Sequence, residues 1–220
     1  MLNLQAGAKP GEPPTPETIR LGTVRMEAHP DYKAVIESAK DVGFEIKYTE
    51  DDPYVKMIEV CDTAGNLIQV EKELGLQKGM RYIDLEHELG HIEQLLRFGE
   101  PGLATDRLIE HANGRRVESR NKKGIMTPWQ YSILEYHNRL NEFLRLYERG
   151  VDVSVLKEHA AGVDKWREIY FNKGLGGHNY GRGGRPNSKQ RARRAWATKY
   201  FGEMSQLVTK YRAALDNIKI

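Results

Sequence analysis

The chain has 220 residues, enough for one large domain or two small ones with a sizeable core. No apolar run approaches the roughly 18 residues that a helix needs to span a bilayer, and no signal peptide is recognisable, which excludes a helical membrane protein and favours a cytoplasmic site of action. The single cysteine, Cys61, excludes an intrachain disulfide and suits a small buried side chain in a reducing compartment.

The first segment, residues 1–17, holds four prolines and two glycines. This composition is typical of a linker rather than of a packed element. We expect it to be either a simple tail or the connection to a larger polypeptide.

A helix and a small sheet are predicted next. Residues 30–42 have a helical apolar face, begin with a proline and are followed by a glycine. Residues 44–48 alternate like a strand, and residues 55–61 and 66–70 form a strand pair around a turn signal. We expect a further helix and short strands between this pair and the next motif.

Residues 81–98 predict an amphipathic helix that contains a complete H-E-x-x-H, from His87 to His91. The apolar stripe consists of Tyr82, Leu85, Leu89, Ile92 and Leu96. Residues four apart lie one above the other on a helix, so His87 and His91 can bind one metal ion away from that stripe. Glu88 would lie beside the ion and could act as general base on a water molecule.

The segment from Leu85 to Ile92 resembles the active-site helix of zincin metallopeptidases. The resemblance covers only this short part of the chain, and the metzincin extension is absent because Gln94 and Arg97 stand where that pattern has Gly and His. A gluzincin-like site with a distant carboxylate ligand fits better.

This resemblance implies an α+β fold in which a small twisted sheet packs on the active-site helix, followed by a mainly helical half. It implies Zn²⁺ held by His87 and His91, Glu88 as base, and a protein or peptide substrate. An edge strand that pairs with extended substrate is expected within residues 55–70.

A catalytic zinc needs three protein ligands and one open position. We predict that the third ligand is Glu118. Glu118 follows the Asn113-Gly114 break, at what reads as the start of a second helix or turn. Glu118-Ser-Arg120 is also similar to a Glu-x-Arg element of some compact bacterial effector peptidases. The alternatives are Glu110, His111 and Glu135, and each of these residues could instead be an ordinary surface side chain.

After residues 99–102 the pattern predicts helices over residues 129–149 and 155–172. His137 falls on the apolar face of the first of these helices, which is typical of a core histidine with a protein partner. His137 is thus a further candidate for the third ligand, but the interpretation as a core histidine is preferred.

One interpretation of the glycine-rich segment, residues 174–186, is a loop that covers the zinc cleft. His178 or Tyr180 could then donate a hydrogen bond to the oxyanion formed during hydrolysis. The alternatives are a phosphate-binding loop and a plain linker to the last helix.

The domain organisation follows as a linker over residues 1–17, a zincin-like domain over residues 18–186 and a basic helix over residues 187–220, capped by Asn187 or Ser188. Residues 182–220 carry ten Lys/Arg and two acidic residues, a net charge of +8, so the preceding residues carry −5 of the overall +3. Such a helix could bind nucleic acid, an acidic protein or an anionic membrane, or could dock on the acidic body of the chain itself.

These observations predict a zinc metalloendopeptidase. The linker and the basic tail resemble the toxin domains of bacterial polymorphic toxins and injected effectors, which implies delivery into a target cell as part of a secreted protein and a cognate immunity or inhibitor protein. The competing hypothesis is a nucleic-acid-binding protein or nuclease that uses the basic helix, with the histidines in a structural or nuclease metal site. A third hypothesis is a degenerate zincin fold kept for protein interaction.

Overall fold

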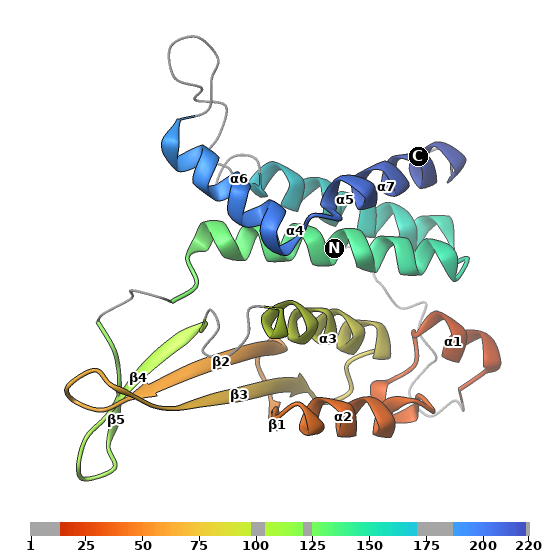
Figure 1. Ribbon diagram of the computed structural model, residues 1–220. Coiled ribbons are helices and arrows are strands. Elements are labelled where there is room, and N and C mark those ends of the chain that lie inside the picture. Colours follow the sequence, from red (N-terminus) through yellow and green to blue (C-terminus); the bar gives the residue numbers. More distant parts are fainter. Residues whose placement is uncertain (1–13, 98–103, 121–124, 171–186, 219–220) are drawn as a thin grey trace. The chain divides into compact units, whose positions relative to one another are not determined.

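The computed structural model describes residues 14–97, 104–120, 125–170 and 187–218, and it divides into two units, residues 1–126 and 127–220 (Figure 1). The first unit combines a five-stranded mixed sheet with helices, and the second is helical in its described part. The α+β class that was expected is therefore confirmed. No helix in these ranges has the length and apolar character required to cross a membrane.

The sheet of the first unit has the strand order β1-β3-β2-β4-β5. Its elements are, in chain order, α1 (Pro16–Leu21), the short 3-10 helix η1 (Met26–Ala28), α2 (Tyr32–Asp41), β1 (Glu45–Thr49), β2 (Tyr54–Cys61), β3 (Leu67–Gln77), α3 (Tyr82–Leu96), β4 (Asp106–Glu110) and β5 (Arg116–Glu118). The pairs β1–β3 and β2–β4 are parallel, whereas β2–β3 and β4–β5 are antiparallel.

The core of the first unit lies where α2 and α3 meet the sheet, with α3 in contact with β2 and α2 in contact with β1 (Figure 1). It is made of buried apolar side chains: Val24, Met26, Ile36, Ala39, Phe44, Leu74, Leu76, Met80, Tyr82, Leu85 and Ile92. Three members of the predicted α3 stripe are in this cluster, and Leu89 packs against it. Leu96 is 38% exposed, so its assignment to the stripe was wrong; the neighbouring Leu95 is buried instead.

The helix expected after residue 70 does not exist, because β3 continues to Gln77. In this stretch Leu74 and Leu76, two residues apart, both enter the core, and this two-residue period suits a strand rather than a helix. A short turn then leads directly into α3.

A second correction concerns the segment after residue 102, which was expected to be helical. It forms the antiparallel β4–β5 hairpin, with Gly114 in the left-handed region (φ 77°) at the turn. Asn-Gly is a strong hairpin signal because such turns need positive φ, whereas it had been interpreted as a break before a second helix or turn.

The expected substrate-binding edge within residues 55–70 stays a prediction. These residues comprise most of β2, the turn after it and the first part of β3, and the strand order places both strands inside the sheet. However, β1 pairs with β3 only from Glu73 to Gln77, so residues 67–70 pair with β2 alone in the described sheet. The outer strands of the described sheet are β1 and β5. The parallel partners of β3 and β2, which are β1 and β4, were not predicted, since parallel pairing is nonlocal and leaves no turn signal.

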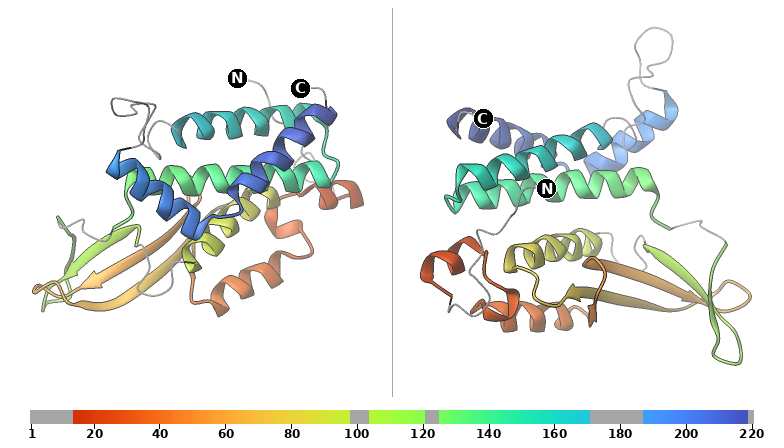
Figure 2. Two further views of the ribbon diagram at one scale, coloured as in Figure 1. Left: turned by 45° about the horizontal axis from the view of Figure 1, so that its top comes forward. Right: turned by 180° about the vertical axis from the view of Figure 1, so that it is seen from behind.

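The second unit contains α4 (Pro128–Glu148), α5 (Val153–Ile169), α6 (Ser188–Tyr200) and α7 (Met204–Ile218), with α4 alongside α5 and in contact with α7 (Figure 2). Asn187 caps α6, as predicted, by accepting a hydrogen bond from Gln190 N at 2.9 Å. The prediction of a single final helix was wrong. Phe201, which separates α6 from α7 in the chain, takes a non-helical conformation (φ −137°, ψ 46°), and its side chain is buried.

Candidate metal centre

The start of α3, the helix that carries the H-E-x-x-H motif, is tied to the preceding chain. The N–H groups of Tyr82 and Ile83 donate to the carbonyls of Val24 and Gly22, both at 2.9 Å. These hydrogen bonds satisfy backbone donors that the first turn of a helix leaves without a partner. Asp84 in that turn accepts from the guanidinium group of Arg81 at 2.8 and 2.9 Å. These contacts fix the first turn of α3, which directly precedes the motif.

His87 and His91 lie one helical turn apart on α3, as the spacing predicts. Their ring centroids are 4.9 Å apart and their planes meet at 87°. His87 is buried and His91 half-buried. Two imidazole rings this close together can bind the same metal ion.

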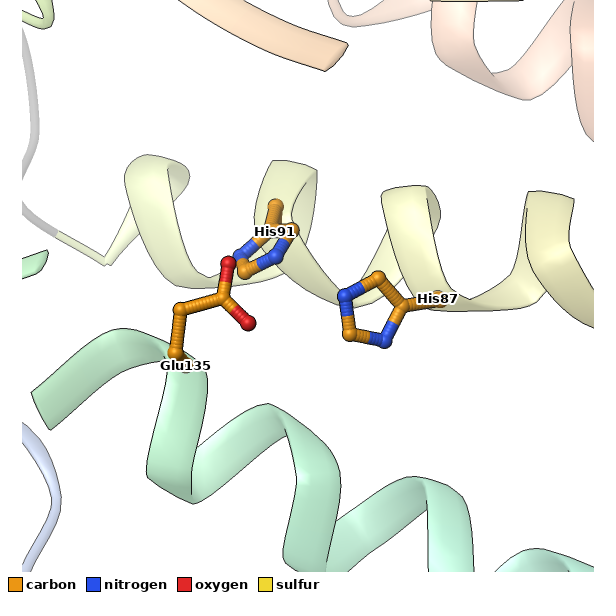
Figure 3. Close-up of side chains that lie close together, drawn as sticks. All are labelled: His87, His91 and Glu135. Atoms are coloured by element: carbon orange, nitrogen blue, oxygen red, sulfur yellow. The ribbon is translucent and has the colours of Figure 1, made fainter. Parts of the chain in front are cut away.

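A carboxylate completes a candidate metal-binding group. His87, His91 and Glu135 of α4 each offer one ligand atom, and these atoms all lie within 4.8 Å of one another (Figure 3). Glu135 is 5% exposed. Two imidazole nitrogens and one carboxylate oxygen are the donor set of one class of catalytic zinc site, and the same set also suits iron(II). The residues present thus fit a divalent transition metal, and their chemistry alone does not decide which one.

Glu88 lies next to His87 on the same helix and is 8% exposed. It is not a member of the ligand group. Around the helix axis it is displaced by about 60° from His91, so it borders the ligand face rather than facing the opposite side. A buried carboxylate beside the ligands, but not among them, can accept a proton from a molecule that approaches the metal.

The side chain of His91 has a buried partner on its own helix. His91 Nδ1 and Gln94 Oε1 are 2.9 Å apart, and Gln94 is 1% exposed. The sequence had drawn attention to Gln94 only as a departure from the metzincin pattern. Its spacing of three residues from a ligand histidine was the signal that could have identified it.

The other predicted ligands lie elsewhere in the first unit. Glu118 is exposed on β5, Glu110 accepts from Arg116 Nε at 2.6 Å, and His111 is exposed in the hairpin turn. Among the described residues, the structure brings none of the three into the group with the histidines. His178 and Tyr180, predicted to stabilise the oxyanion, lie outside the described residues.

His137 has the structural role that its position on an apolar helix face suggested. It is 3% exposed, its Nε2 lies 3.0 Å from Glu203 Oε1, and its ring packs against Phe201 with centroids 4.7 Å apart. A buried polar side chain needs such partners. The interpretation of His137 as a core histidine is confirmed.

Comparisons with protein families, with curated proteins and with solved structures gave no match to this chain. The residues of the site form a candidate group of two histidines and one glutamate for binding a metal ion.

Proposed function

We propose that this protein is a zinc-dependent peptidase. The observation that carries the proposal is the donor set of His87, His91 and Glu135, combined with a buried glutamate that directly follows the first histidine. A chance amphipathic helix would not need two imidazoles on one face and a carboxylate at the position where a general base is required.

In this proposal His87, His91 and Glu135 hold the metal through two nitrogens and one oxygen. When bound, zinc polarises a carbonyl group and lowers the pKa of a coordinated water towards neutrality. Glu88 takes up the proton of the attacking water on its carboxylate and passes it to the leaving amine. Its burial excludes competing solvent from this proton transfer.

Glu135 is preferred to Glu118 as third ligand on two grounds. The Glu135 carboxylate is buried and close to both imidazoles, whereas Glu118 is exposed on β5. The histidines and Glu135 come from different units of the chain, so their joint use of one metal ion is part of the proposal.

Exchange of Glu88 for glutamine tests the proposal. The variant keeps the shape of the side chain and loses the base, so zinc content stays at one ion per chain while peptide cleavage falls by roughly 100-fold or more. Cleavage is measured on a peptide library by mass spectrometry of newly formed termini. The matched control is Glu93→Gln, an exposed glutamate of the same helix.

Two results would contradict this function. One is a zinc-loaded wild-type protein that cleaves no peptide in the library. The other is a Glu88→Gln variant that is as active as the Glu93→Gln control.

A second candidate function has its own support. The helix α6 carries five Lys/Arg and no acidic residue among its 13 residues, a distribution that attracts polyanions. A nucleic-acid-binding protein would retain an oligonucleotide in a salt-dependent manner, and Glu88→Gln would leave that retention unchanged. The same pair of assays thus separates a peptidase from a binding module.

The role of a delivered toxin or effector rests on the proline-rich segment and the basic tail alone, and we keep it as a proposal. It implies that the peptidase acts inside a target cell and that an immunity or inhibitor protein accompanies it. Toxicity on intracellular expression of the wild-type chain, abolished by Glu88→Gln, would support it.

A further inference from the structure

We propose that Gln94 is a positioning residue that fixes the tautomer of His91 for metal binding. This inference rests on the metal site of the proposed function and extends it beyond the ligands. Its basis is the 2.9 Å contact between His91 Nδ1 and Gln94 Oε1.

The direction of this hydrogen bond follows from the chemistry of its partners. The amide oxygen of glutamine can only accept, so His91 must donate through an Nδ1–H group. A neutral imidazole with its proton on Nδ1 carries its lone pair on Nε2. The contact therefore selects the tautomer in which Nε2 can coordinate the metal, and it also limits rotation of the ring.

The burial of Gln94 supports a specific role. The side chain is 1% exposed, on a helix whose other strongly buried residues are largely apolar or belong to the site. Burying an amide is unfavourable unless it is hydrogen-bonded, whereas leucine would fill a similar volume at no such cost. The contact with His91 gives the buried amide oxygen a hydrogen-bond partner.

The neutrality of Gln94 has a consequence for reactivity. Two neutral imidazoles and one carboxylate leave a net charge of +1 on a site that holds a divalent cation. A carboxylate at position 94 would bind the same Nδ1–H group more strongly and make His91 a better donor, but it would also reduce the positive charge available to polarise a substrate. The amide orients His91 without that loss.

The experiment compares Gln94→Leu with Gln94→Glu in the full-length protein. Zinc affinity is measured by competition with a chromophoric chelator, and the coordination geometry by the visible spectrum of the Co²⁺-loaded protein. We expect Gln94→Leu to weaken zinc binding by about 10- to 100-fold and to alter the cobalt spectrum. We expect Gln94→Glu to bind zinc at least as tightly as the wild type and to cleave peptides more slowly.

The control is Glu93→Gln, the exposed neighbour, for which affinity and spectrum stay unchanged. If Gln94→Leu binds zinc with wild-type affinity and an unchanged cobalt spectrum, the role of Gln94 is refuted and the metal site stands. If the wild type itself binds no zinc, the metal site and the proposed function fall together. Because glutamate is nearly isosteric with glutamine, the Gln94→Glu variant provides a result even if the leucine variant misfolds.

Discussion

The regions around His29 and His91 belong to the same unit, yet they use a histidine side chain in opposite ways. His29, 9% exposed, has Nε2 at 3.2 Å from the carbonyl of Ile19 and accepts at Nδ1 from the N–H of Asp31 at 3.2 Å. Both of its nitrogens are engaged by backbone, and its ring stacks on Tyr82 with centroids 3.5 Å apart. His91 has one nitrogen on a side-chain amide and contributes one ligand atom to the candidate metal group. The partners of the two ring nitrogens therefore distinguish His29, which is held by backbone groups, from His91, which is a candidate metal ligand.

The largest effects are expected when each imidazole ring is removed, which tests the difference between the two histidines. His91→Ala should weaken zinc binding by more than about 100-fold, because it removes a ligand, and should change the stability of the metal-free protein little. His29→Ala should do the reverse: it should lower the free energy of unfolding by roughly 1–3 kcal/mol and leave zinc affinity intact.

Chemical denaturation of metal-free protein and zinc competition measure the two quantities separately. A loss of zinc affinity in His29→Ala that equals the loss in His91→Ala would show that the two histidines do not differ in role.

The second test compares two glutamates. Glu135→Gln should weaken zinc binding by about 10- to 100-fold or more, since an anionic ligand becomes a neutral one, whereas Glu118→Gln on exposed β5 should change it little. Isothermal titration of both variants provides the measurement. Should Glu118→Gln be the damaging exchange, the sequence-based choice of third ligand would be right and Glu135 would not be a ligand.

The smallest effect concerns a buried phenol in the second unit. Burial raises the pKa of Tyr136 to about 12. The unfolded chain ionises this group near pH 10, so its contribution to stability is complete below that value and is lost as the pH rises from about 10 to 12. Tyr136→Phe should reduce the pH-dependent loss by about 1 kcal/mol per pH unit at most, measured by urea unfolding at pH 8 and pH 11. An unchanged pH dependence would assign the effect to the other buried tyrosines.

Local signals explain what the sequence could predict. The spacing of His87 and His91 and the stripe of Leu85 and Ile92 depend only on helical periodicity, and the structure has both. The strand at Leu74 was missed because its acidic and basic neighbours resemble a solvated helix, and only contact with the core decides between the two.

The third ligand could not be ranked from the sequence for a different reason. Glu118 and Glu135 both stand at plausible distances from the motif along the chain, and chain distance does not encode which one is buried. The run Ile133-Leu134-Glu135-Tyr136, with a carboxylate inside an apolar segment, was the stronger hint, because an acidic residue is seldom buried without a partner.

The position of α3 between β3 and β4 in the chain has a consequence for how the protein is made. The hairpin β2–β3 can form from neighbouring residues. The strand β4 pairs with β2 rather than with β3, so it can join the sheet only after the intervening helix α3 has been synthesised. Loop-closure entropy makes such distant pairing slow. During synthesis, a nascent chain released before residue 106 would carry the two imidazoles on an unfinished sheet, with the inner strand β2 still open on one side to pairing with other chains.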